Sequence, residues 1–148
     1  MNSIKLSPKG TYEWNENFET GIKRIDFEHE VFLELINSFK LAYEKGMAEV
    51  ELKRIIIEIE KYAEFHFISE ENFMLRINFP EYKQHQIIHL DLLEQLNLAK
   101  HIQNDFSEFL GFLYKWFSNH TVFEDKKIQE FVVQNQIDVG KFWYDINV

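Results

Sequence analysis

Apolar residues recur every three or four positions in four long segments of this chain, which is the spacing of one face of an α-helix. The first segment shows the pattern with Ile22, Ile25 and Ile36 on one stripe. Glycine and proline, the residues that interrupt helices, number only 5 and 2. The pattern predicts four helices, at about residues 21–45, 49–77, 81–101 and 106–134.

The links between these segments are short and contain helix-ending and helix-starting signals. Gly46 follows the first helix, Pro80 precedes the third, and Asn104 and Asp105 can cap the fourth. Short links force successive helices to run antiparallel. We therefore expect an all-α fold, an antiparallel up-down-up-down four-helix bundle.

The length of 148 residues predicts a single domain, residues 1–148. Residues 1–20 are expected to form an irregular N-terminal arm, and the last dozen residues a short C-terminal segment. The N-terminus has no apolar signal region, and no apolar run is long enough for a transmembrane helix. We expect a cytoplasmic protein.

Composition and charge exclude several classes of function. Cysteine is absent, which rules out disulfides, iron–sulfur clusters and cysteine-based zinc sites. The formal charge is -9, from 25 acidic and 16 basic side chains. Such a surface repels phosphate backbones and anionic lipids, so we expect no nucleic-acid or membrane partner.

Histidines and carboxylates interrupt the apolar stripes at ligand spacing. His66 with Glu70, and His85 with His89, are four residues apart, so each pair lies one turn apart on one helix face. Imidazole is the commonest nitrogen ligand for iron, copper and zinc. The candidate metal ligands are His29, His66, Glu70, His85, His89, His120 and Asp125. Seven ligands on four helices are more than one tetrahedral zinc ion can bind, and they suit two metal ions bridged by carboxylates.

Burial supplies a second argument for a metal. A buried carboxylate without a partner is costly, and no Lys or Arg lies near Glu70 on the stripes of the first three helices. A cation from solution would neutralise it. The neighbouring Glu71 is interpreted as part of a solvated face, and His101 as a cation at a helix C-terminus.

The fourth helix fits the metal hypothesis less well. Its stripe continues from His120 to Glu124 and Ile128. Asp125 is about 140° around an ideal helix from His120, at the edge of the stripe. Spacing alone would not select Asp125.

The order, identity and spacing of these residues resemble the hemerythrin family, in particular its bacterial type. The resemblance runs from Trp14 to about Ile128, most of the chain. The matching segments are TGIKRIDFEH (20–29), HFISEENFM (66–74), FPEYKQHQIIH (79–89) and WFSNHTVFED (116–125).

The resemblance implies a non-haem site with two iron ions (Fe2+/Fe3+) and an oxo or hydroxo bridge, which binds dioxygen reversibly. By matching position, one iron takes His85, His89 and His120. The other takes His29 and His66, and keeps an open position for dioxygen. Glu70 and Asp125 bridge the two irons.

This reading makes the protein an oxygen-binding protein for storage, delivery or buffering rather than an enzyme, with at most a weak peroxidase-type side activity. No side chain has to act as a catalytic acid or base. Its partner is dioxygen, and the protein that receives the oxygen is unknown. The sequence departs from the family at Phe117 and Thr121, where Leu and Ile are common. We expect Phe117 to narrow the dioxygen pocket and an inward Thr121 hydroxyl to speed autoxidation.

Two other functions compete with oxygen carriage. The first is a di-iron redox enzyme of the peroxidase or oxidase type, but such ferritin-like sites use paired E-x-x-H motifs, which are absent here. The second is an oxygen or redox sensor module; we expect no fused signalling domain in a chain of this length, although it could signal through a partner.

Overall fold

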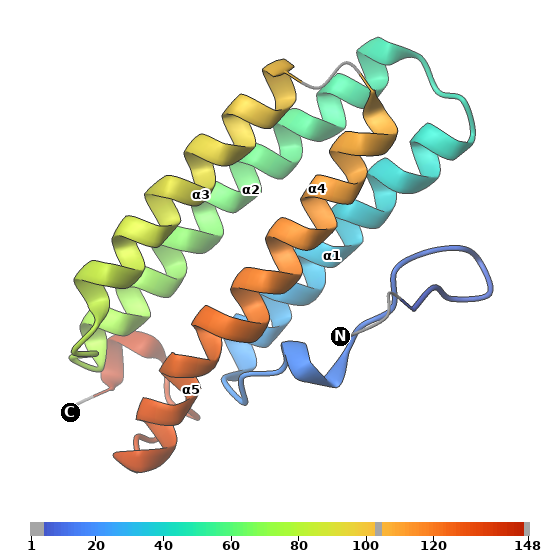
Figure 1. Ribbon diagram of the computed structural model, residues 1–148. Coiled ribbons are helices and arrows are strands. Elements are labelled where there is room, and N and C mark those ends of the chain that lie inside the picture. The colour runs from blue at the N-terminus through green and yellow to red at the C-terminus, as the bar shows by residue number, and fades with distance from the viewer. Residues whose placement is uncertain (1–4, 103–104, 147–148) are drawn as a thin grey trace.

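The computed structural model describes residues 5–102 and 105–146 and confirms the all-α four-helix bundle (Figure 1). Its long helices are α1 (Lys23–Glu44), α2 (Glu49–Arg76), α3 (Tyr82–Ile102) and α4 (Phe106–Asn119), followed by α5 (Asp125–Gln134). Helix α1 packs on α2 and α4, and α3 packs on the same two helices, so successive helices run antiparallel around one core. None of the described helices meets the length and hydropathy that crossing a bilayer requires.

Local signals in the sequence explain where the helices begin and end. Gly46 has a positive φ of 74°, which glycine adopts without strain, and the amide of Met47 donates to the carbonyl of Ala42 to close α1. The side chain of Asp105 accepts a hydrogen bond from the amide of Ser107 and caps α4. Asn104, the other predicted cap, lies outside the described residues. Pro80 stands two residues before α3, where its missing N–H costs no helical hydrogen bond.

The fourth helix differs from the continuous segment that the pattern predicts. After α4, residues His120–Glu124 form one π-helical turn, η2, before α5 begins at Asp125. A π turn accommodates one extra residue and shifts the helical register after it. Asp125 is therefore fully buried, whereas Glu124 is partly exposed beside Lys127. The prediction that Glu124 continues the buried stripe is wrong for this reason.

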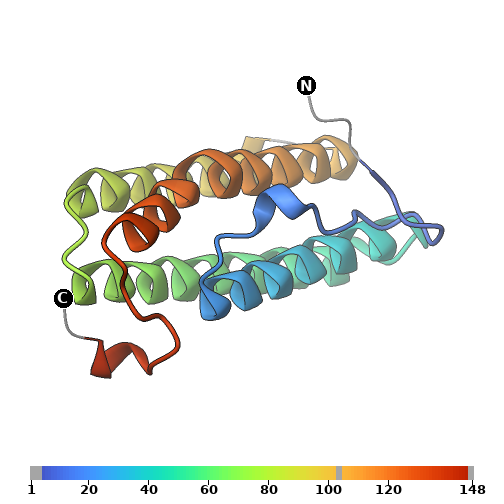
Figure 2. The same ribbon diagram turned by 90° about the horizontal axis from the view of Figure 1, so that it is seen from below.

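The N-terminal arm and the C-terminal segment both pack on the bundle. The arm crosses α1 and α4 (Figure 2), where Tyr12 exchanges two hydrogen bonds with Asn37 and stacks on Tyr114. A 3-10 turn, η1 (Glu16–Phe18), ends with Phe18 buried against Phe117. After α5 the chain turns back to a second 3-10 turn, η3 (Trp143–Asp145), which contacts α2.

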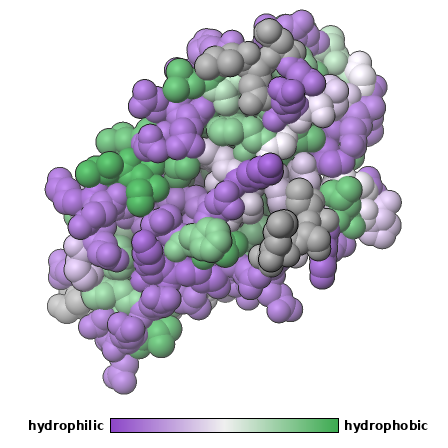
Figure 3. Space-filling view, in the orientation of Figure 1, coloured by the Kyte–Doolittle hydropathy of each residue, from purple (hydrophilic) through white to green (hydrophobic). Residues whose placement is uncertain are grey.

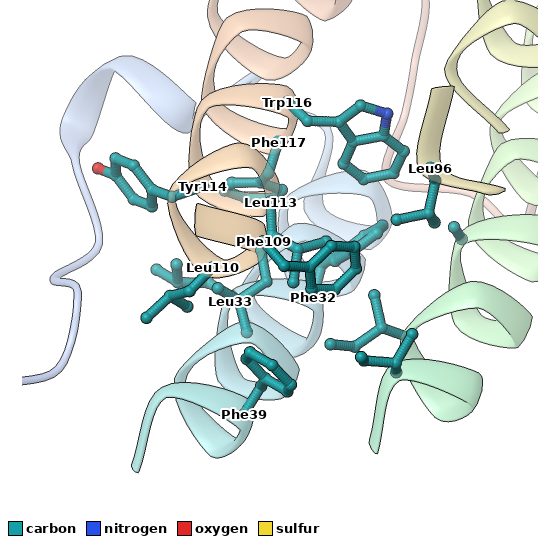
Figure 4. Packing of buried hydrophobic residues seen from close by; sticks show 14 of the residues in the cluster. Phe32, Leu33, Phe39, Leu96, Phe109, Leu110, Leu113, Tyr114, Trp116 and Phe117 are labelled. Atoms are coloured by element: carbon teal, nitrogen blue, oxygen red, sulfur yellow. The ribbon is translucent and has the colours of Figure 1, made fainter. Parts of the chain in front are cut away.

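Buried apolar residues form two clusters along the bundle. The larger contains buried aromatic residues of α1 and α4 together with apolar residues of α2 and Leu96 of α3, and Figure 4 shows Phe32, Phe109 and Trp116 converging between the helices. The smaller cluster lies nearer the other end of the bundle and includes Ile25, Ile77 and Ile128. On the face in Figure 3, hydrophilic residues predominate and apolar residues form small separate patches. The predicted ligands occupy the stretch of core between the two clusters.

Candidate metal centre

All seven predicted ligands are buried and meet in the middle of the bundle. Helices α1, α2 and α3, the π turn η2 and helix α5 contribute to the cluster, which consists of His29, His66, Glu70, His85, His89, His120 and Asp125. Their ligand-type atoms form two overlapping groups, and within each group the atoms lie within 4.8 Å of one another. Glu70 and Asp125 belong to both groups.

The two oxygens of each carboxylate face different histidines. On one side, Oε1 of Glu70 is 2.8 Å from Nε2 of His85 and 3.1 Å from Nε2 of His89. Its other oxygen, Oε2, is 3.5 Å from Nε2 of His66 and 3.8 Å from Nε2 of His29. Glu70 thus spans the two groups of imidazoles.

Asp125 divides its oxygens in the same way. Its Oδ1 is 3.2 Å from Nε2 of His85 and 3.1 Å from Nε2 of His120, while Oδ2 is 3.0 Å from Nε2 of His29. The π turn makes this placement possible, because it brings Asp125 to the same face as His120. Three histidines lie on one side of the two carboxylates, and two lie on the other.

Hydrogen bonds among the described residues do not satisfy this cluster. Although the distances are short, both ring nitrogens of His29 and both oxygens of Asp125 lack a hydrogen-bond partner there. Nε2 of His66 and of His120, and Oε2 of Glu70, also lack one. Buried polar atoms are almost always paired, so lone pairs converging on one another call for a cation between them. The donor set of imidazoles and carboxylates fits transition-metal ions.

The pKa shifts of the clustered residues also indicate a site for a cation. Burial opposes the charged form of Glu70, but the nearby imidazoles of His66, His85 and His89 hold its pKa well below the usual range. Burial likewise opposes protonation of His66, yet its hydrogen bond to Glu28 and the nearby carboxylate of Glu70 raise its pKa to about 10. In the metal-free protein, protons on His66, His85 and His89 therefore balance the charge of the carboxylates, in the place that a metal cation would take.

Two acidic residues outside the predicted ligand set orient the histidines. Glu28 accepts a hydrogen bond at 2.7 Å from Nδ1 of His66, and also binds Ser69 and Arg24. Glu71 accepts one at 2.7 Å from Nδ1 of His89. Such carboxylates fix the tautomer that leaves Nε2 free for a metal.

The interpretation of Glu71 as part of a solvated face is therefore wrong, because its side chain is only 15% exposed. Both residues had a signal in the sequence. Glu28 directly precedes His29, and Glu71 directly follows Glu70, so each is an acidic residue at the edge of a ligand stripe. His101 is exposed in the last turn of α3, away from the cluster, as the sequence predicts.

A small apolar cavity adjoins the cluster. Its walls include Phe32, Phe117 and Thr121, and it touches His29 and His66. The cavity volume is about 10 Å3, which is room for roughly one water-sized molecule. Phe117 is buried and its ring meets that of His29 edge-on at 6.0 Å between centroids. The predicted position of Phe117 and Thr121 beside a ligand pocket agrees with this geometry.

A four-helix bundle with imidazoles and carboxylates converging in its core belongs to the class of bundles that bind metal between facing helices. The sequence profile described as the hemerythrin HHE cation binding domain matches residues 20–132. The chain belongs to the hemerythrin family.

Individual relatives agree with this assignment. A bacteriohemerythrin from Clostridium acetobutylicum is 29% identical over 126 residues, which cover 78% of this chain and 97% of the relative. A hemerythrin subunit alpha from Lingula anatina is 28% identical over 118 residues, 78% of this chain and 91% of the relative. A bacteriohemerythrin from Pseudomonas aeruginosa is 27% identical over 111 residues, 72% of each chain. The resemblance to bacterial hemerythrins that the motifs predict is confirmed.

Proposed function

We propose that this protein binds dioxygen reversibly at a non-haem di-iron site. The proposed ligands of one iron are His85, His89 and His120, and those of the other are His29 and His66. Glu70 and Asp125 would bridge the two ions. The observation that supports this most is the division of each carboxylate's two oxygens between the two groups of histidines.

The position of the cavity supports a binding role at the two-histidine side. Both histidines of that side, His29 and His66, border the cavity, whereas of the three histidines on the other side only His120 does. Two histidines and two shared carboxylates leave that side with fewer protein ligands than the other. When bound, ferrous iron there would supply the electrons that hold dioxygen.

The residues around the cavity exclude water rather than transfer protons. Phe32, Phe67 and Trp116 are buried walls, and Phe67 stacks on the ring of His89 with 4.1 Å between centroids. An apolar wall keeps water and protons from a bound ligand and so favours its release unchanged. Because no acid–base side chain other than the ligands faces the cavity among its lining residues, we propose carriage rather than catalysis.

The family membership and the names of the relatives support iron as the metal and an oxygen-binding role. We propose that one domain, residues 1–148, is sufficient for binding. A cytoplasmic location stays a prediction, as does the oxo or hydroxo bridge between the irons.

The test is a visible spectrum of the ferrous-loaded protein, taken first without oxygen, then in air, then under argon. A charge-transfer band that appears in air and fades under argon supports the proposal. A ferric spectrum that appears and does not reverse contradicts reversible binding and favours the redox-enzyme or sensor alternative. Metal analysis of the same sample should give two irons per chain, and one or none would contradict the di-iron site.

A further inference from the structure

The outward face of α2 carries large apolar side chains that the bundle leaves in solvent. Val50, Ile57, Ile68 and Leu75 are 67%, 52%, 59% and 52% exposed, although each is the kind of residue that a helix usually buries. They lie on the side of α2 opposite His66, which faces the core. Between Val50 and Leu75 the helix extends about 37 Å.

These residues belong to a regular seam with alternating steps of four and three residues, the spacing of a coiled coil. We call this seam the α2 seam. Its eight members are Val50, Arg54, Ile57, Lys61, Glu64, Ile68, Glu71 and Leu75. Apolar residues occupy both ends and two inner positions, while charged residues occupy the others.

The seam is complementary to itself when two copies run antiparallel. In that arrangement Val50 meets Leu75 of the second copy, and Ile57 meets Ile68 of the second copy. At the centre, Lys61 meets Glu64 of the second copy. Each pair occurs twice, because the twofold axis makes the interface isologous. We propose that the α2 seam is a homodimer interface, with a second copy of this chain as its occupant.

The remaining pair of the seam, Arg54 with Glu71, contributes less to the dimer. Arg54 would meet Glu71 of the second copy, but Glu71 already accepts a hydrogen bond from His89 of its own chain. The two apolar layers and the Lys61–Glu64 layer therefore define the interface. Within one chain Nζ of Lys61 is 3.6 Å from Oε2 of Glu64, but the two side chains are 72% and 51% exposed, so both can reach a partner as well.

The same residues disfavour other arrangements. A parallel pair would place Lys61 against Lys61 and Glu64 against Glu64. Sliding the antiparallel pair by one heptad would set Lys61 against Ile57, or Glu64 against Ile68. The seam also carries no net formal charge, with Arg54 and Lys61 balancing its two glutamates, whereas the whole chain has a charge of -9. The seam itself therefore adds no net repulsion between the copies.

Sedimentation of the intact iron-loaded protein at increasing concentration tests the proposal. We expect a dimer of twice the 18.0 kDa chain mass, with half-association at micromolar to sub-millimolar concentration, on the order of 1–300 μM. Lys61→Glu and Glu64→Lys should each weaken the dimer about tenfold or more, because each creates two like-charge contacts. An equimolar mixture of the two variants should form a mixed dimer, since their charges are again complementary.

Matched variants separate the interface from a general effect on folding. Ile68→Ser should weaken the dimer, whereas Ile87→Ser, at an isoleucine on α3 that is 64% exposed, should not. The double variant Lys61→Glu with Glu64→Lys should dimerise as the parent does. A parent protein that stays monomeric up to about 1 mM overturns the proposal. A dimer that Lys61→Glu, Glu64→Lys and Ile68→Ser leave unchanged overturns it as well.

Discussion

His120 and Asp125 are five residues apart, and the π-helical turn between them brings Nε2 of His120 to 3.1 Å from Oδ1 of Asp125. In an uninterrupted α-helix, Glu124 would take the inward position instead. The turn therefore selects which carboxylate enters the core. A local departure from α-helical geometry at a functional site is typical of π turns.

The substitution Asp125→Asn tests this selection. It keeps the size of the side chain but removes the charge and one oxygen acceptor of the proposed bridge. We expect iron affinity to fall by more than the roughly 10–100-fold that changes around a metal site usually cause, and the iron content to drop below two per chain. Glu124→Gln is the matched control, because Glu124 lies partly exposed beside Lys127, and it should retain the parent's iron content. Equal losses in both variants would contradict the role of the π turn.

Helical periodicity predicted the positions of most of the site. His66 with Glu70, and His85 with His89, follow a four-residue spacing that places each pair on one face, so their burial together was predictable. The bundle followed from the same stripes and from the short links. The burial of Asp125 could not be predicted in this way, because helical periodicity assumes a constant 3.6 residues per turn and the chain departs from that value at His120.

The hydrogen-bond partners of the histidines were harder to predict. Glu28 lies 38 residues before His66, and its contact with that ring depends on how α1 packs against α2. Glu71 reaches His89 from the neighbouring helix in the same way. Helical periodicity gives the face of one helix but not the register between two helices. The rule that a metal-binding imidazole needs an acceptor would have directed attention to acidic neighbours of the stripes.

Glu28 should matter for metal binding although it is not a proposed ligand. Its carboxylate accepts hydrogen bonds from His66, Ser69 and Arg24, and these bonds outweigh burial and lower its pKa. We expect Glu28→Gln to weaken ferrous-iron binding about 10–100-fold, because the amide is a poorer acceptor for Nδ1–H of His66. Competition with a chelator under anaerobic conditions measures this. Glu30→Gln, on the exposed side of α1, should bind as the parent does, and an equal effect there would contradict the prediction.

The metal-free protein should lose stability as the pH rises from about 7 to 10. Burial opposes protonation of His66 and His85, but hydrogen bonds to nearby carboxylates raise the pKa of each from 6.5 to about 10. A pKa raised on folding contributes stability that is fully present below 6.5 and is lost as the pH passes through 10. Metal replaces these protons, so the loaded protein should show a smaller fall. Thermal unfolding of both forms across this range measures the difference, and a metal-free melting temperature that is flat or rising would contradict it.

Phe117 should control how fast a ligand enters the cavity. Its ring packs between Phe18 and His29, with centroid distances of 5.3 and 6.0 Å. Phe117→Leu should enlarge the cavity, raise both the association and dissociation rates of dioxygen in rapid-mixing experiments, and cost about 1–2 kcal/mol of stability. Phe109→Leu is the control, because Phe109 is equally buried but does not line the cavity. If both variants changed the rates alike, the effect would come from loosened packing rather than from the pocket wall.

Thr121 is the one hydroxyl-bearing residue among those that line the cavity, and it is buried. A hydroxyl there can donate a hydrogen bond to a ligand in the cavity and so promote its loss as a reduced product. Thr121→Val removes the hydroxyl and keeps the shape of the side chain. We expect irreversible oxidation of the air-exposed ferrous protein to slow by about 2- to 10-fold, the value of one hydrogen bond. Ser118→Ala is the control, because the Ser118 hydroxyl donates to the carbonyl of Lys115 instead. An unchanged oxidation rate in Thr121→Val would show that the hydroxyl takes no part, and the rate would then depend on the apolar walls alone.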